Sequence, residues 1–248
     1  MGTERGPMVD ENSQAQINPN QPAGNPEWGY RLNFAPSPTA ILHDFCGENR
    51  IEGAFCPHCQ KPLLRLLSLN TKDEVLNIDP AKIPAVHLLY CWTCGIPFDE
   101  FCYRMNDDGS VSLLKVLLRY PSEFGPEGPY DGYTGVFGIH QVSLDPVSSE
   151  DQQRYKASWM ADDVDSCDWD CEVFHQVGGY PYLYNPERRC CPGCGMDMPF
   201  FASICDNATG NDAFAASGND SFCDNGGVVM IFYFCRLCSV VSAYHSCD

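Results

Sequence analysis

The sequence is poor in basic residues. It contains 15 lysines and arginines against 33 aspartates and glutamates, so its formal net charge is −18. Such a surface repels the phosphate backbones of nucleic acids, and nucleic-acid binding is therefore not expected. Complementary charge instead favours a basic protein as the partner.

Features of membrane attachment and export are also missing. No run of about 18 or more apolar residues occurs, so we expect no membrane-spanning helix. Residues 1–20 are polar and lack the apolar stretch of a secretory signal. Gly2 could accept a myristoyl group, but Gly6 stands where that motif needs Ser or Thr. These absences predict a cytoplasmic protein in a reducing compartment.

The common catalytic motifs are absent as well. The sequence has no Gly-x-Ser-x-Gly, P-loop, dinucleotide fingerprint or His-Glu-x-x-His. Five aspartates lie between residues 162 and 170, but without the terminal glutamate of an EF-hand they indicate a solvated acidic face. We therefore predict that the protein is not an enzyme.

The apolar pattern is that of strands more than of helices. Short runs rich in strand formers occur at 86–90, 111–120 and 228–234. Gly109 follows three Asn and Asp residues and marks a turn before the second run. One helix is expected near 150–160. The predicted fold class is α+β, mainly β.

Composition also divides the chain. Residues 1–40 are rich in Asn, Gln, Pro and Gly and predict a flexible N-terminal arm, of which Trp28, Tyr30, Leu32 and Phe34 could dock a part on the body. Residues 41–248 predict a single domain. The stretch 145–170 is acidic and forms a connector within it.

Cysteine, by contrast, is abundant, with 16 residues. Eight of them form four Cys-x-x-Cys pairs, and each such turn brings two thiolates to one side of a metal. Two pairs together supply the four ligands of a tetrahedral zinc. We therefore predict two structural zinc ions, one held by Cys56, Cys59, Cys91 and Cys94 and one held by Cys191, Cys194, Cys235 and Cys238.

Three other interpretations of the pairs remain open. A redox pair normally occurs singly at the start of a helix, whereas here four pairs adjoin predicted strands. Disulfides are typical of secreted proteins. Iron accepts four thiolates as zinc does, and ligand softness does not separate the two metals.

The residue after each pair bears on the shape of its turn. Gly95 and Gly195 permit the positive φ that relieves a tight turn. Gln60 and Ser239 occupy the same place in the other two turns. These two turns are therefore predicted to close differently.

The other eight cysteines have no assigned role. Cys167 and Cys171 could begin a third metal site, and buried free thiols are ordinary core residues. Cys190 could replace Cys191 as a ligand, but the repeat described next favours Cys191. The set is Cys46, Cys102, Cys167, Cys171, Cys190, Cys205, Cys223 and Cys247.

An internal repeat relates the two sets of pairs. Each set follows the order of Cys pair, apolar strand, variable stretch, apolar strand, Cys pair and trailing cysteine. Phe55 in the first copy aligns with Cys190 in the second. This order predicts duplicated, pseudo-twofold halves at about 41–135 and 165–248, each with a zinc-ribbon-like module of four cysteines.

A second candidate site follows the acidic stretch. His175 precedes Gly178 and Gly179, which permit positive φ, and then Tyr180 and Pro181. These residues could line a pocket or form a structural bend. A hydrolase or redox enzyme that uses His175 or an unassigned cysteine is an alternative to the non-catalytic prediction.

The order of these segments resembles the YwqG-like family. The resemblance rests on 174–181, 198–204, 224–227 and 229–234, and covers about 45–248. The stretch from Cys56 to Cys94 is similar to the related programmed cell death protein 2 family. That resemblance implies a dedicated chaperone for a basic ribosomal protein, whereas the bacterial relatives imply interaction and toxin-immunity roles.

Together these observations predict a zinc-stabilised, non-catalytic protein-interaction module. A chaperone or an immunity-type binder of a basic client would fit both the charge and the resemblance. The alternative is a zinc-ribbon protein associated with nucleic acid or transcription, which would require a basic stripe.

Overall fold

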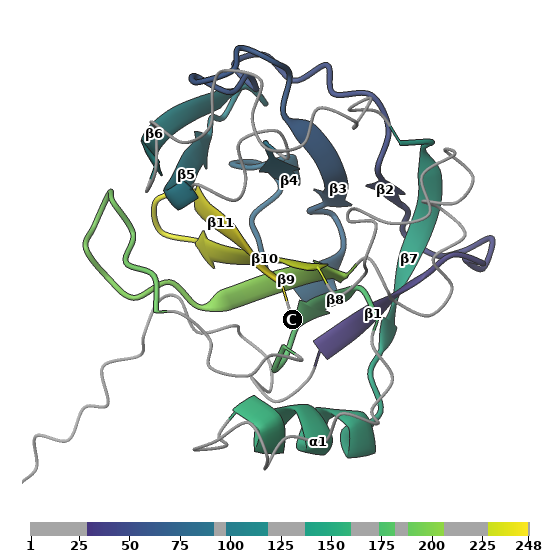
Figure 1. The fold of residues 1–248 in the computed structure, drawn as a ribbon. Helices are drawn as coiled ribbons and strands as arrows, with labels where there is room; N and C mark the ends of the chain where they lie inside the picture. Colours follow the sequence, from purple (N-terminus) through teal and green to yellow (C-terminus); the bar gives the residue numbers. More distant parts are fainter. Residues whose placement is uncertain are drawn as a thin grey trace, which may run out of the picture.

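The computed structural model describes residues 29–91, 98–118, 137–159, 174–181, 188–205 and 228–247. These residues form one antiparallel sheet that curls around an apolar core, with a single α-helix at one end (Figure 1). The elements are β1 (Gly29–Asn33), β2 (His43–Phe45), β3 (Leu64–Asn70), the 3-10 helix η1 (Glu74–Leu76), β4 (Ala85–Tyr90), β5 (Phe98–Met105), β6 (Val111–Leu118), β7 (His140–Pro146), α1 (Ser149–Trp159), β8 (Gln176–Gly178), β9 (Phe200–Cys205), β10 (Val228–Cys235) and β11 (Val240–Cys247).

The eleven strands lie in the order β4-β3-β2-β7-β1-β8-β9-β10-β11-β5-β6. The prediction of a mainly β protein is confirmed, and the three predicted apolar runs form β4, β6 and β10. Gly109 has φ +84° and closes the turn between β5 and β6, as expected. The predicted helix is α1. No helix in the described ranges is long and apolar enough to cross a membrane.

The strand β1 lies inside the range 1–40 for which the sequence predicted an arm. It pairs with β7 on one side and β8 on the other, so it is an interior strand of the sheet. Leu32 is buried in the core, and Phe34 packs edge-on to Phe45 at 5.1 Å between ring centroids. Residues 29–33 are therefore part of the sheet rather than of an arm, and residues 1–28 lie outside the described ranges.

The strand β10 is buried on both faces. Met230, Phe232 and Phe234 point into the main core. Ile231 and Tyr233 belong to a smaller apolar core on the opposite face. Successive side chains of a strand point to opposite faces. The uninterrupted apolar run of β10 thus reflects a strand that is covered on both sides.

The curled sheet is closed along β4 by side chains of β5. The hydroxyl of Tyr103 accepts a hydrogen bond from Leu89 N and donates one to His87 O, both at 2.8 Å. His87 N also donates to the sulfur of Met105 at 3.3 Å. An edge strand normally leaves such backbone groups unpaired. Here β5 supplies partners for the edge of β4 without a backbone ladder.

This closure predicts that Tyr103→Phe is costly. Tyr103 is fully buried, and its loss of the hydroxyl would leave Leu89 N–H and His87 C=O without this partner. We expect a fall of about 2–4 kcal/mol in the free energy of unfolding, measured with urea. Tyr30→Phe, at a half-buried tyrosine of β1, is the control and should change it by under about 0.5 kcal/mol. A similarly small effect at Tyr103 would contradict the role of the hydroxyl.

Candidate metal centres

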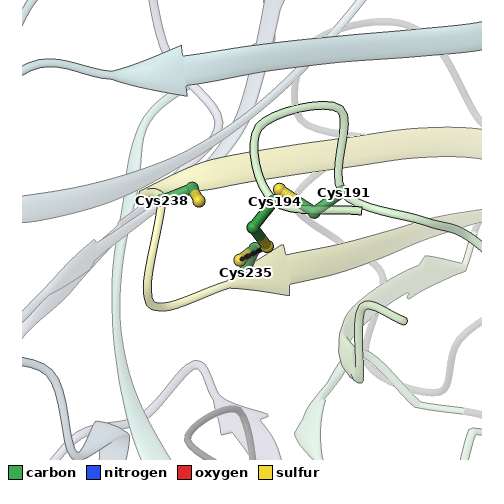
Figure 2. Close-up of side chains that lie close together, drawn as sticks. All are labelled: Cys191, Cys194, Cys235 and Cys238. Carbon is green, nitrogen blue, oxygen red and sulfur yellow. Dashed lines mark hydrogen bonds between the residues drawn. The ribbon is translucent and has the colours of Figure 1, made fainter. Parts of the chain in front are cut away.

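Four cysteines of the C-terminal part converge on one point. The sulfurs of Cys191, Cys194, Cys235 and Cys238 all lie within 4.8 Å of one another (Figure 2). The sulfurs of Cys194 and Cys235 are 3.8 Å apart. Four sulfurs that each lie about 2.3 Å from a central zinc stand about 3.8 Å apart in a regular tetrahedron. This group, the second cluster, has the size of a tetrahedral thiolate site.

Three of the four predicted ligands of the other site also come together. The sulfurs of Cys56, Cys59 and Cys91 lie within 4.8 Å of one another, with Cys59 and Cys91 3.6 Å apart. Cys94, the fourth predicted ligand, lies outside the described residues. These three cysteines, the first cluster, could hold a metal from one side.

Both clusters are positioned by hairpins of the sheet. In the second cluster, Cys191 and Cys194 lie in the turn that leads to β9, and Cys235 is the last residue of β10. In the first cluster, one pair precedes β3, and Cys91 directly follows β4. Since β9 pairs with β10 and β3 with β4, a metal would join the start of each hairpin to its end.

The turns before β3 and β9 share their backbone hydrogen bonds. In each turn the first cysteine donates to the residue five positions later, and the residue after the second cysteine donates back to the first cysteine. The bonds are Cys56 N to Lys61 O (2.9 Å), Gln60 N to Cys56 O (2.9 Å), Cys191 N to Met196 O (2.8 Å) and Gly195 N to Cys191 O (2.8 Å).

The prediction that Gln60 and Ser239 close their turns differently is wrong. Gln60 has φ +59° and Ser239 φ +56°, the same left-handed conformation as Gly195 at φ +73°. The turn fixes the backbone whichever residue stands there, at the expense of steric strain for a residue with a Cβ. Gln60 gains a local hydrogen bond from its side chain to Pro57 O at 2.7 Å.

The strain at Ser239 gives a test of this geometry. We expect Ser239→Gly to raise the free energy of unfolding by about 0.5–1 kcal/mol, because glycine adopts positive φ without steric cost. The reverse control is Gly195→Ser, which should lower it by a similar amount, since open space surrounds a Cβ at Gly195. Thermal unfolding measures both. A fall in stability for Ser239→Gly would contradict the left-handed turn.

Backbone N–H groups and burial act in opposite directions on the thiols of the second cluster. A backbone hydrogen bond from Met196 lowers the pKa of Cys194. Burial raises the pKa of Cys235 and of Cys238 above the usual range. A bound cation favours the thiolate form and would offset that burial. The buried thiols of this cluster are therefore suited to a metal more than to free thiolate chemistry.

Two residues inside the second cluster's turns were missed in the sequence. A Cβ at Gly193 would stand 3.2 Å from the sulfur of Cys238, so glycine allows the two pairs to approach closely. The guanidinium of Arg236 donates to Leu76 O at 3.0 Å and lies 5.9 Å from the ring centre of Phe201. Burial lowers the pKa of Arg236. The glycine is visible between the two cysteines, whereas the contact of Arg236 with η1 leaves no local signal.

None of the unassigned cysteines that the structure describes belongs to either group of sulfurs, although Cys102 and Cys205 are buried in the same smaller apolar core as Cys191 and Cys235. Cys190 is exposed, and its thiol donates to Asp197 Oδ1 at 3.6 Å. Cys46, Cys102 and Cys205 are buried, and burial raises the pKa of the Cys46 thiol. No disulfide joins any two cysteines whose side chains are described. Cys167, Cys171 and Cys223 lie outside the described residues, and Cys247 ends β11.

The residues of the candidate pocket around His175 pack against neighbouring parts of the chain. His175 is buried, and its Nδ1 accepts a hydrogen bond from Cys205 N at 3.2 Å. A Cβ at Gly179 would lie 2.2 Å from Gln152 Oε1, an atom of α1 that also accepts from Tyr180 N at 3.3 Å. Gly178 has φ +70°. Each of these contacts is one that a structural bend makes.

No protein-family model, curated protein or solved structure matches this chain. The two clusters are therefore the strongest observation from which a function can be argued. Their geometry is compatible with metal binding, and all of their described ligand atoms are sulfur.

Proposed function

We propose that this protein is a zinc-stabilised, non-catalytic protein-interaction module. The convergence of four sulfurs in the second cluster carries the proposal. Four thiolates fill the tetrahedral coordination of zinc and leave no position for water or substrate, which is typical of structural sites. The first cluster would reach the same state with Cys94 as its fourth ligand.

The duplication of the chain and its zinc-ribbon character belong to the same proposal. The shared hydrogen bonds of the turns before β3 and β9 support it, as does the pairing of each turn with the end of the next strand. In a zinc ribbon two such turns from neighbouring strands hold one ion. Each hairpin would therefore be one copy of an ancestral zinc-binding unit.

The proposed partner is a basic protein client. The net charge of −18 supports this choice, because opposite charge steers association. The resemblance to the YwqG-like and programmed cell death protein 2 families adds a specific form of the proposal, a chaperone or an immunity-type binder. In that role the metals would keep the sheet folded, and the surface of the protein would bind the client.

Metal content tests the first part of the proposal. Elemental analysis of protein purified without added metal should give about two zinc ions per chain. Three ions would add a site that includes Cys167 and Cys171. Iron in place of zinc would correct the metal but keep the structural role. A metal-free chain with few free thiols would overturn the proposal in favour of disulfides.

Binding to defined charged probes tests the second part. We expect the zinc-loaded protein to bind a fluorescent lysine-rich peptide, to ignore a glutamate-rich peptide of equal length, and to lose affinity as salt rises. Duplex DNA is the third probe and should not bind. Tighter binding to DNA than to the basic peptide would favour the nucleic-acid alternative. Equal binding to both peptides would contradict a basic client.

A further inference from the structure

The turn between β5 and β6 joins the surroundings of the two clusters. We infer that this turn couples them, so that metal binding at one cluster raises the affinity of the other. The inference rests on the proposed zinc sites and adds a regulatory property to them. Three successive backbone contacts carry it.

The first contact connects the turn to the second cluster. Met105 N, at the end of β5, donates to Ser239 O at 2.9 Å. Ser239 directly follows Cys238 and is held in the left-handed conformation. Its carbonyl therefore stands where the turn from Cys235 to Cys238 meets the ladder of β11 and β5, in which Val240 is opposite Arg104. A metal that closes this turn would also fix the partner of Met105.

The second contact connects the turn to the segment before the first cluster. Val111 N, at the start of β6, donates to Glu52 O at 2.9 Å. Gly53 has φ +80°, and a Cβ at this position would lie 2.0 Å from Val111 O. The backbone of this segment thus lies directly against β6. Two residues further on, Phe55 leads into Cys56.

The third contact lies within the turn. Met105 and Val111 stand opposite each other in the register of β5 and β6. Asn106 N donates to Ser110 O at 2.9 Å, and the Asn106 side chain donates to Ser110 Oγ at 2.9 Å. This turn is internally hydrogen-bonded on both backbone and side chain. Displacing one of its ends would therefore disturb the other.

The coupling follows from the order that each metal imposes. A cluster without metal leaves its turn free to move and weakens the hydrogen bond to the turn between β5 and β6. A metal that orders the turn at one end reduces the conformational entropy that the second metal must still remove. Coupling between sites in proteins commonly amounts to about 5–150-fold in affinity, and it is reciprocal.

The test measures the zinc affinity of the second cluster with and without the first. Zinc is titrated against a chromophoric chelator, into the full chain and into the Cys56→Ser/Cys59→Ser variant. We expect the second cluster to bind zinc about tenfold more weakly in the variant. Unchanged affinity would overturn the coupling. Since the variant would still bind one zinc ion, that result would leave the proposed structural sites intact.

A matched pair of glycine variants locates the coupling. Gly53→Ala and Gly179→Ala both place a Cβ at positive φ against a close neighbour, which is Val111 O at 2.0 Å for Gly53 and Gln152 Oε1 at 2.2 Å for Gly179. Of the two, only Gly53 contacts the strand β6. In the Gly53→Ala background, removal of the first cluster should change the affinity of the second by less than about twofold, whereas in Gly179→Ala the full effect should persist. Equal effects in both backgrounds would show that the route through Gly53 and Val111 is wrong.

Native mass spectrometry gives a second reading. With one equivalent of zinc, coupled sites should yield fewer singly loaded chains, and more empty and doubly loaded chains, than two independent sites with the affinities of the separate clusters. A distribution that matches independent sites would contradict the coupling. Absence of any zinc-bound species would instead overturn the structural zinc sites themselves.

Discussion

Cys235→Ser is expected to remove the metal from the second cluster and to unfold the hairpins around it. Cys235 is buried at the end of β10, and its sulfur lies 3.8 Å from that of Cys194. Structural zinc commonly contributes about 10–16 kcal/mol of apparent binding free energy. This is comparable to the whole stability of a typical domain, about 5–15 kcal/mol. Loss of one ligand should therefore outweigh any cavity that the substitution leaves.

The control for this variant is Cys205→Ser. Cys205 is equally buried, but it lies outside both clusters, and its thiol donates to Phe174 O at 3.7 Å, a bond that serine can keep. We expect Cys205→Ser to retain two zinc ions and to lower the free energy of unfolding by about 1–3 kcal/mol. Elemental analysis with urea unfolding measures both variants. Full metal content in Cys235→Ser would contradict the assignment of this ligand.

The sequence revealed the cysteine clusters because their signal is local. A Cys-x-x-Cys turn places two sulfurs together by chain geometry alone, and the order of the pairs indicated which turns would meet. The left-handed conformation at Gln60 escaped prediction because it goes with the hydrogen bond from Gln60 N to Cys56 O across the turn rather than with the residue type, and Ser239 has the same conformation. Composition favours glycine there but does not exclude other residues.

The closure of the sheet could not be predicted in the same way. Tyr103 bonds to the edge of β4, and β1 inserts between β7 and β8, more than 100 residues away along the chain. The first contact depends on how β5 crosses β4, with Tyr103 14 residues after Leu89, and the second depends on the register of strands that are remote in sequence. Polar composition around β1 indicated an arm, although its alternating apolar residues already fitted a strand with one buried face.

Acid is expected to destabilise the protein well before its carboxylates are protonated. Two largely buried histidines bond to hydroxyl groups: His87 bonds to Ser68 Oγ at 2.8 Å and His245 to the hydroxyl of Tyr90 at 2.7 Å. Burial lowers the pKa of each to about 4. At His87 the nearby Arg65 guanidinium acts in the same direction, and Asp44 opposes it.

The direction of the pH effect follows from these pKa values. An unfolded chain has histidine pKa values near 6.5, so between about pH 6.5 and 4 the unfolded state binds more protons than the folded state. The stabilisation that depends on neutral histidines is fully present above about pH 6.5, and it falls as the pH decreases through this window. Each histidine contributes a loss of about 3 kcal/mol by pH 4. Burial also lowers the pKa of His43, against the attraction of Asp73, and this adds to the same trend.

Urea unfolding at pH 7 and pH 4.5 of the natural protein and of His87→Asn measures this effect. Asparagine can keep a hydrogen bond to Ser68 but does not titrate, so the variant should lose about 2–3 kcal/mol less than the natural protein between the two pH values. Metal release also contributes in acid, since thiolates must bind protons as zinc leaves. That contribution is common to both proteins and cancels in their difference. Equal losses would therefore show that His87 is not held neutral by burial.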